Sequence, residues 1–188
     1  MAIEIERRFL VSDVVAAMAA PGLVDCAQLR QGYFGHTGGF KLRVRVLSDA
    51  GGRRSAMLTR KSRRCGMCRE EYEWPLDCDT AERALASLPP SQIVRKWRFH
   101  IRRNNGFVWS IDCFEGRNAG LTIAEVELAR PGQYVELPGW VGAEITMNPR
   151  YGNSTLAGKP ILDWQELDDR GSKLRSSPLL QPAVGLLD

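Results

Sequence analysis

The sequence of 188 residues contains no apolar run near the roughly 20 residues that a membrane-spanning helix requires. Its first eleven residues also lack the uninterrupted apolar stretch of a secretory signal peptide, because two glutamates and two arginines fall within them. We therefore expect a protein that resides in the cytoplasm and has no membrane as a partner.

Histidine is scarce, with two copies, and the five cysteines are odd in number. In the absence of a secretion signal, an odd count argues against a disulfide framework and favours free thiols. Cys65 and Cys68 have the spacing of a zinc or redox motif, but a structural zinc site needs four ligands and no second pair accompanies them. We therefore assign no metal site to this pair.

The charge balance is almost even, with 26 Lys and Arg against 22 Asp and Glu. A pI of 8.9 is lower than that of most dedicated nucleic-acid-binding domains, so nucleic acid is not the expected partner. The arginines between Arg53 and Arg64 nevertheless keep open a non-catalytic protein that binds polyphosphate or RNA. The length predicts a single domain over residues 1–168, followed by a flexible tail over 169–188 that is rich in Gly, Ser and Pro.

Alternation of apolar and polar residues predicts mostly strands. The eight predicted strands are residues 2–10, 24–36, 40–47, 55–62, 69–76, 92–103, 107–115 and 121–129. Short helices are predicted over 13–20 with Ser12 as the N-cap, over about 80–88 with Asp79 or Thr80 as the N-cap, and over 153–157. Residues 131–140 are predicted to form a loop.

Charged side chains follow one face of nearly every predicted strand, and three strands carry two acids at positions i and i+2. Such acids repel each other unless cations lie between them. One interpretation is that these faces are simply solvated, as most charge runs are. The alternative is that the eight strands close into a barrel, so that the charged faces meet in one lumen and the apolar faces pack on helices outside.

A closed barrel would place six cations and seven acids in its lumen. The cations are Arg8, Arg43, Arg45, Lys61, Lys96 and Arg98, and the acids are Glu4, Glu6, Glu71, Glu73, Asp112, Glu125 and Glu127. Two divalent cations would change the formal sum from −1 to +3, which suits a polyphosphate. Carboxylates without His or Cys favour a hard ion such as Mg²⁺ or Mn²⁺, whereas Arg and Lys suit phosphoryl oxygens.

The order of these motifs resembles the CYTH superfamily, also called the triphosphate tunnel metalloenzymes. Its opening ExExK motif is similar to Glu4-Ile5-Glu6-Arg7-Arg8 in this chain, with Arg8 in place of Lys. Further matching blocks follow in order between Ile3 and Trp164: Gln31-Gly32-Tyr33, Arg43-Val44-Arg45, Leu58-Thr59-Arg60-Lys61, Arg69-Glu70-Glu71-Tyr72-Glu73, Arg95-Lys96-Trp97-Arg98, Asp112-Cys113-Phe114-Glu115-Gly116, Ala124-Glu125-Val126-Glu127 and Tyr151-Gly152-Asn153.

The resemblance implies an α+β, mainly β fold, in which eight antiparallel strands form a closed tunnel with helices packed outside. It implies a hydrolase that binds a triphosphate and one or two divalent metals and cleaves a phosphoanhydride bond. The implied metal ligands are Glu4, Glu6, Asp112, Glu125 and Glu127, and the implied phosphate-binding residues are Arg8, Arg43, Arg45, Lys61, Glu73, Lys96 and Arg98. Glu73 is expected to face the substrate, and the role of Glu71 stays open.

For the chemistry, we expect a metal-bound water, aided by Lys96 or Glu6, to attack a terminal phosphorus so that diphosphate leaves. Arg8 is the third expected catalytic residue. An arginine keeps the positive charge of the usual lysine but is effectively never deprotonated, so binding should tolerate this change better than proton transfer does.

The resemblance favours an inorganic triphosphatase and leaves several alternatives open. One is a class IV adenylate cyclase, although the His-Phe pair that precedes ExExK in those enzymes is not found in this sequence. Others are a thiamine or nucleoside triphosphatase, since the scaffold alone does not fix the substrate. Members of the superfamily are often dimers, which makes a homodimer an expectation here.

Overall fold

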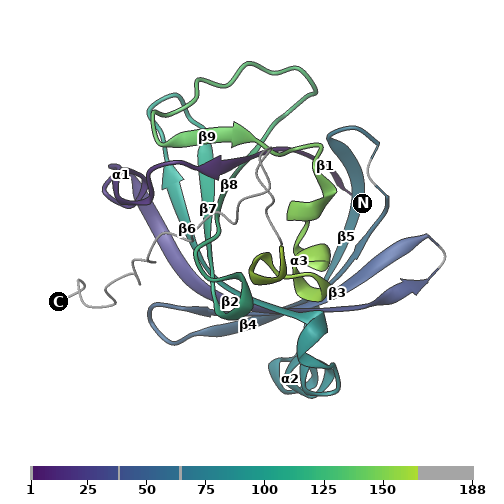
Figure 1. The fold of residues 1–188 in the computed structure, drawn as a ribbon. Coiled ribbons are helices and arrows are strands. Elements are labelled where there is room, and N and C mark those ends of the chain that lie inside the picture. Colours follow the sequence, from purple (N-terminus) through teal and green to yellow (C-terminus); the bar gives the residue numbers. More distant parts are fainter. Residues whose placement is uncertain (1, 38, 64, 165–188) are drawn as a thin grey trace.

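The computed structural model describes residues 2–37, 39–63 and 65–164. This part of the chain forms a single sheet of nine antiparallel strands (Figure 1). The strands are β1 (Ala2–Val11), β2 (Leu23–Thr37), β3 (Phe40–Asp49), β4 (Arg54–Lys61), β5 (Cys68–Leu76), β6 (Ile93–Arg102), β7 (Val108–Phe114), β8 (Thr122–Glu127) and β9 (Val141–Glu144).

Eight of these strands close into a barrel. Their order around the barrel is β5-β4-β3-β2-β6-β7-β8-β1, and β1 returns to pair with β5. The closure joins Ala2–Ile5 of β1 to Cys68–Glu71 of β5, and β9 then covers the remainder of that edge by pairing with Phe9 and Val11. The prediction of a closed eight-stranded antiparallel barrel is confirmed.

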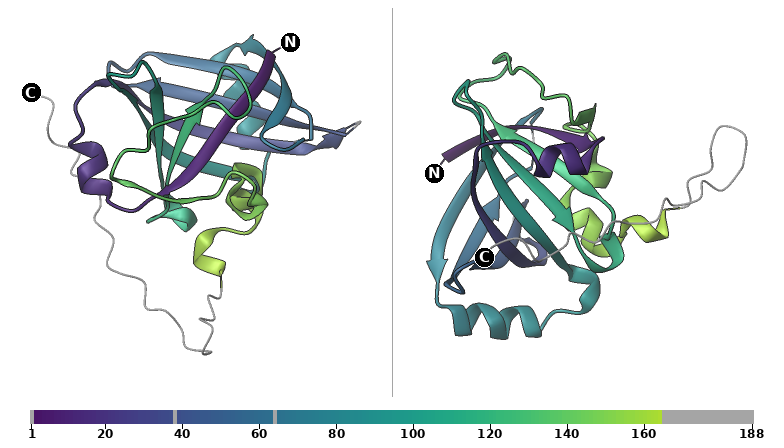
Figure 2. Two further views of the ribbon diagram at one scale, coloured as in Figure 1. Left: turned by 90° about the horizontal axis from the view of Figure 1, so that it is seen from above. Right: turned by 90° about the vertical axis from the view of Figure 1, so that its left-hand side faces the viewer.

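Short helices surround the barrel, as the two further views show (Figure 2). They are α1 (Val14–Met18), α2 (Cys78–Ala86) and α3 (Asn153–Gly158), together with the 3₁₀ turns η1 (Pro90–Gln92), η2 (Gly116–Asn118), η3 (Pro149–Tyr151) and η4 (Ile161–Asp163). No helix in the described ranges has both the length and the apolar character needed to cross a membrane.

Two apolar clusters lie outside the barrel wall. One packs Phe9, Trp109, Val126 and Trp140 beneath α1 and the 128–140 loop, and the other packs Val44, Val46 and Ala56 of β3 and β4 against α2. Strand alternation then directs the intervening polar side chains into the barrel, where Glu6, Arg8, Arg43, Lys96 and Asp112 are buried. Stability therefore comes largely from the outer surface of the sheet.

A third apolar cluster lies inside the barrel and closes one of its ends. Val94, Phe114 and Ile123 come from the inner faces of β6, β7 and β8, and Leu156 and Ala157 come from α3. The charged side chains of the interior follow farther along the same strands, at Lys96, Asp112 and Glu125.

Glycine permits the close approach of α2 to the barrel. A Cβ atom on Gly32 of β2 would lie 2.4 Å from Leu88 Cδ1 and 2.7 Å from Leu85 Cδ2. Gly106, in the Asn-Asn-Gly turn between β6 and β7, has a φ of +84°, which residues with a side chain rarely adopt.

Several local predictions were wrong. The N-cap of α1 is Asp13, whose carboxylate accepts from Ala16 N, because the Ser12 hydroxyl instead donates to the carbonyl of Trp140. The N-cap of α2 is Asp77, which accepts from Thr80 N and starts the helix earlier than predicted. Strand β9 was not predicted, since Val-Gly-Ala-Glu carries no alternating pattern. The predicted tail over 169–188 lies outside the described residues.

Candidate active site

The barrel interior carries a nearly balanced set of charges. Eight cations and seven acids lie on the inner faces of the strands: Arg8, Lys41, Arg43, Arg45, Lys61, Arg69, Lys96 and Arg98, with Glu4, Glu6, Glu71, Glu73, Asp112, Glu125 and Glu127. All thirteen residues of the cluster predicted from the sequence are included. Lys41 and Arg69 are additional, and they change the formal sum to +1.

A cavity of about 490 Å³ opens from this interior. Its wall is formed by the inner faces of β1, β2, β3, β4, β5 and β8, by the β4–β5 connection, and by residues 146–155. Six cations line it, namely Arg8, Lys41, Arg43, Lys61, Arg63 and Arg69, whereas Glu6 and Glu125 are its only acids among the described residues. The cavity is therefore much more basic than the interior as a whole, which suits a polyanion.

The cations on β3, β4 and β5 are held by neighbouring carboxylates. Lys61 Nζ lies 2.7 Å from Glu71 Oε2 and 3.1 Å from Glu4 Oε1. Arg43 donates to Glu73 Oε1 at 3.1 Å and to the Thr59 hydroxyl at 2.9 Å. These pairs fix the directions of the cationic side chains before any anion binds.

Burial and like charge perturb the cations of this wall. Burial, reinforced by Arg43 and Arg69, lowers the pKa of Lys61. Burial, with Arg43 and Arg98 nearby, lowers the pKa of Arg45 to about 10. An anion entering the cavity would relieve this repulsion, so the wall gains more from a bound polyanion than exposed cations would.

Deeper in the barrel, Lys96 and Arg98 of β6 share the carboxylate of Asp112 on β7. Arg98 makes two 2.7 Å hydrogen bonds to Asp112 and a 2.6 Å hydrogen bond to Glu125 Oε2, and Lys96 forms an ion pair with Asp112. Burial lowers the pKa of Lys96 to about 8, although Asp112 opposes this effect. Lys96 and Asp112 are 1% and 0% exposed, so these two side chains do not line the cavity.

Arg8 joins β1 to the segment that covers one side of the cavity. Its guanidinium donates to the main-chain carbonyls of Tyr151 at 3.2 Å and Thr146 at 3.3 Å, and its backbone N–H donates to the Thr146 hydroxyl at 3.0 Å. Glu6 Oε1 lies 3.7 Å from Arg8 Nε. Across the cavity, Lys41 Nζ donates to the Ser154 hydroxyl at 2.8 Å. The 146–155 segment is thus anchored on both β1 and β3.

Comparison with known proteins identifies the family. The chain is 36% identical over 163 residues to an inorganic triphosphatase of Acetivibrio thermocellus, covering 87% of this chain and 98% of the relative. It is 32% identical over 157 residues to an inorganic triphosphatase of Nitrosomonas europaea, covering 82% and 96%. The chain belongs to the CYTH-like inorganic triphosphatase family. No protein-family model matches it.

Solved structures agree with this family assignment. The crystal structure of an inorganic triphosphatase superposes with a TM-score of 0.59 at 29% identity, covering 84% of this chain and 96% of that chain. A protein of Pyrococcus horikoshii shares the fold at a TM-score of 0.55 and 20% identity, covering 69% of this chain and 80% of that chain. The fold of the inorganic triphosphatase family thus accounts for the barrel.

The five acids that the family resemblance assigned to a metal occupy different environments. Glu6 and Glu125 line the cavity, Glu127 is exposed at the end of β8, and Glu4 and Asp112 are engaged by Lys and Arg side chains. Among the described residues, no three His, Cys, Asp or Glu side chains are grouped as a metal site. Glu6 and Glu127 are nevertheless cross-strand neighbours, and their all-oxygen chemistry fits a hard divalent ion.

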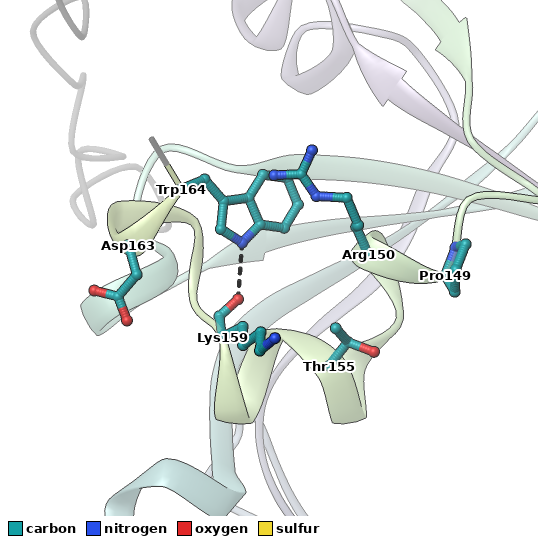
Figure 3. Close-up of a pocket in the computed structure, with 6 residues that line it drawn as sticks. All are labelled: Pro149, Arg150, Thr155, Lys159, Asp163 and Trp164. Carbon is teal, nitrogen blue, oxygen red and sulfur yellow. Dashed lines mark hydrogen bonds between the residues drawn. The ribbon is translucent and has the colours of Figure 1, made fainter. Parts of the chain in front are cut away.

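A second, larger hollow of about 680 Å³ is lined by residues of η3, α3 and η4 and by Trp164 (Figure 3). Arg150 lies over the Trp164 ring, 4.1 Å from its centroid, and Trp164 Nε1 donates to the Lys159 carbonyl. Its only acid in the described chain, Asp163, is paired with Arg117. The hollow is larger than the barrel cavity but shares none of the barrel's inward-facing charges, so the barrel cavity is the candidate site of this triphosphatase family member.

The charged cluster predicted from the sequence left out several inward-facing residues. Lys41 and Arg69 alternate in phase with Arg43 and Glu71, so strand periodicity could have identified both. Thr59 and Tyr33 are inward by the same rule. No comparable signal marks residues 146–155, because they form a loop and a short helix whose place over the cavity depends on the tertiary fold.

Proposed function

We propose that this protein hydrolyses inorganic triphosphate to diphosphate and phosphate with the help of a divalent cation. The observation that carries the proposal is the cavity inside the barrel, which is lined by six cations and two acids. Its volume of about 490 Å³ suits a small polyanion. The membership in the inorganic triphosphatase family supports the same substrate.

Phosphate binding would exchange one set of anions for another. Arg43, Lys61 and Arg69 now face Glu4, Glu71 and Glu73, and phosphoryl oxygens would take over donors from these carboxylates. We propose that Arg43, Lys61, Arg69 and Lys41 bind phosphates directly. Arg45, Arg98 and Lys96 lie deeper, and their positive charge would support binding of the innermost phosphate.

We propose that Glu6 and Glu125, with Glu127 on the same face of the β1–β8 pair, hold a Mg²⁺ or Mn²⁺ ion. Such an ion supplies charge neutralisation and polarises a phosphoryl oxygen. Glu4 and Asp112 would then orient Lys61, Lys96 and Arg98 in preference to binding metal. Between the two residues expected to assist the attacking water, Glu6 is favoured, because it lines the cavity and Lys96 does not.

Arg8 has a different role in this proposal. Its guanidinium is occupied by two main-chain carbonyls of the covering segment, so we assign it to maintaining the cavity wall. The five cysteines are free in the structure, and this fits the reducing cytoplasm that we propose as the location of the protein.

The test is phosphate release from inorganic triphosphate, ATP and thiamine triphosphate, each with Mg²⁺, with Mn²⁺ and with a chelator. We expect metal-dependent release that is fastest from inorganic triphosphate and that falls at least a hundredfold in Glu125→Gln. Glu115→Gln is the matched control, because Glu115 contacts Gln28 outside the barrel at 3.2 Å, and it should retain activity.

Three results would contradict the proposal. Release that persists in chelator would remove the metal requirement, and equal loss in both variants would remove the assignment to the cavity. If no phosphate is released from any of the three substrates while tight polyphosphate binding is retained, the chain would be a binding protein on this scaffold.

A further inference from the structure

The connection between β4 and β5 ends in a tight hairpin that carries two cysteines. Cys65 N–H donates to the Cys68 carbonyl at 2.9 Å, and Cys68 N–H donates to the Cys65 carbonyl at 3.1 Å. Gly66, the first of the two turn residues, has a φ of +62°, which is the requirement of a type II′ hairpin turn. Cys65 and Cys68 therefore face each other directly across the hairpin.

This pairing places the two thiols within bonding reach. Residues that exchange both main-chain hydrogen bonds have Cα atoms about 5.5 Å apart, which is within the range that disulfides span. Directly opposed side chains also lie on the same face of a hairpin. Cys68 is paired with Ile5, whose side chain packs against the outer apolar cluster, so both thiols lie on the outer face and not in the cavity.

The hairpin is part of the cavity wall. Ser62, Arg63 and Gly66 line the cavity, and Arg69, which follows Cys68, forms ion pairs with Glu4 and Glu6 inside the barrel. In this connection, Ser62 N–H donates to the Glu70 carbonyl, and nearer the tip Cys65 and Cys68 bond to each other. Two main-chain hydrogen bonds thus hold the two sides of the hairpin tip together. A covalent link there would stiffen this side of the cavity.

We propose that Cys65 and Cys68 are a redox modification site, at which a reversible disulfide tightens the cavity wall for its polyphosphate ligand. The exposed Cys65 thiolate attacks one sulfur of a low-molecular-weight disulfide such as oxidised glutathione, and one reduced thiol leaves. The Cys68 thiolate then attacks the Cys65 sulfur of the mixed disulfide, and the second reduced thiol leaves. The two cysteines lose two electrons and two protons, which end on the two released glutathione thiols.

The bond should be easily reversed. The stabilisation that a disulfide provides grows with the logarithm of the number of residues in the loop that it closes. The loop closed here contains only four residues. Disulfides that are exposed and contribute little stability are the labile ones in a reducing compartment. Fixing the wall in advance reduces the ordering cost of binding, so the oxidised form should bind polyphosphate more tightly.

The experiment treats the full chain with oxidised glutathione and maps disulfides by mass spectrometry of peptides. It then compares the oxidised and reduced protein for calorimetric binding of inorganic triphosphate and for the KM of hydrolysis. We expect a Cys65–Cys68 bond and a severalfold lower dissociation constant and KM, all reversed by dithiothreitol. Cys65→Ser and Cys68→Ser should bind like the reduced protein under both conditions, and Cys26→Ser, altered on β2, should behave like the unaltered chain.

Absence of a Cys65–Cys68 bond after oxidation would overturn the proposal, and so would a bond that leaves triphosphate binding unchanged. An oxidant effect that persists in Cys65→Ser would assign the response to another thiol. The KM readout rests on the proposed function, whereas disulfide mapping and calorimetry do not. A protein that hydrolyses no triphosphate would therefore contradict the proposed function, and disulfide mapping and calorimetry would still test the redox site.

Discussion

Replacement of Arg8 by Lys distinguishes whether this side chain maintains the cavity wall or acts on the reaction itself. The structure shows the Arg8 guanidinium donating to the carbonyls of Thr146 and Tyr151, at 3.3 and 3.2 Å, in a buried position. A lysine keeps the charge but offers a single nitrogen, so we expect Arg8→Lys to lose one of the two bonds. A hydrogen bond to a charged group contributes about 1.5–3 kcal/mol. A loss of about 2 kcal/mol corresponds to a roughly thirtyfold larger population of molecules in which the 146–155 segment is detached from Arg8.

The assay is hydrogen exchange of the amides in residues 146–157, together with KM and kcat for inorganic triphosphate. We expect roughly thirtyfold weaker protection there, a higher KM, and a kcat no higher than that of the unaltered protein. Arg7→Lys is the matched control, because Arg7 is on the outer face and pairs with Glu144 at 2.7 Å in an exposed position. Exposed pairs contribute about 0–1 kcal/mol, so protection should change little.

The opposite pattern would refute this reasoning. If Arg8→Lys raised kcat and left the protection of residues 146–157 unchanged, Arg8 would act on the reaction itself. Its presence in place of the usual lysine would then limit turnover.

Three further predictions concern the buried charges and the barrel wall. Asp112→Asn should lower the unfolding free energy by about 3–5 kcal/mol, because it leaves two buried cations without their shared acid. Lys96→Met should lower the unfolding free energy far less, because Arg98 still neutralises Asp112. Urea denaturation of both variants measures this difference, and equal losses of stability would contradict the prediction. The pKa of Lys96 falls from 10.5 to about 8 on folding, so the unfolded chain binds more protons than the folded chain between these pH values. The free energy of unfolding of the unaltered protein, relative to that of Lys96→Met, should therefore rise from about pH 8 to 10.5. A relative free energy of unfolding that falls over this range would contradict the prediction. Gly32→Ala should lower the melting temperature by several degrees, since its Cβ would lie 2.4 Å from Leu88 Cδ1 and 2.7 Å from Leu85 Cδ2. An unchanged melting temperature would mean that these two leucine side chains move aside freely.

Strand periodicity made most of the fold predictable. Alternating apolar and charged residues identify eight strands, and the charged faces imply an enclosed polar interior, as Lys96 and Asp112 illustrate by their burial. Strand β9 was not predictable, because its four residues are held by pairing with β1 and not by a pattern of their own. Asp13 and Asp77 show similarly that the choice between adjacent capping residues depends on contacts made elsewhere in the chain.

The candidate site was predictable to the extent that it lies on strands. Every inward charge obeys the alternation, yet the sequence could not show which acids would pair with cations and which would face the cavity. Glu4 and Glu6 are two residues apart on one strand, but Glu4 is closely paired with Lys61 and Arg69, whereas Glu6 lines the cavity and lies 3.7 Å from both Arg8 and Arg69. That difference arises from the stagger of β1 against β5 and β8, which is a property of the closed barrel.

The two apolar clusters on the outside of the barrel have an evolutionary consequence. In most enclosed folds the residues that provide the folding energy also fill the centre, so a change of central residues threatens the whole molecule. Here Phe9, Trp109 and Val44 pack outside the wall, and much of the centre is available for charged groups. Compensating exchanges of interior acids and bases can then change the ligand that the barrel accepts while the scaffold stays intact, so one architecture can serve many phosphate compounds.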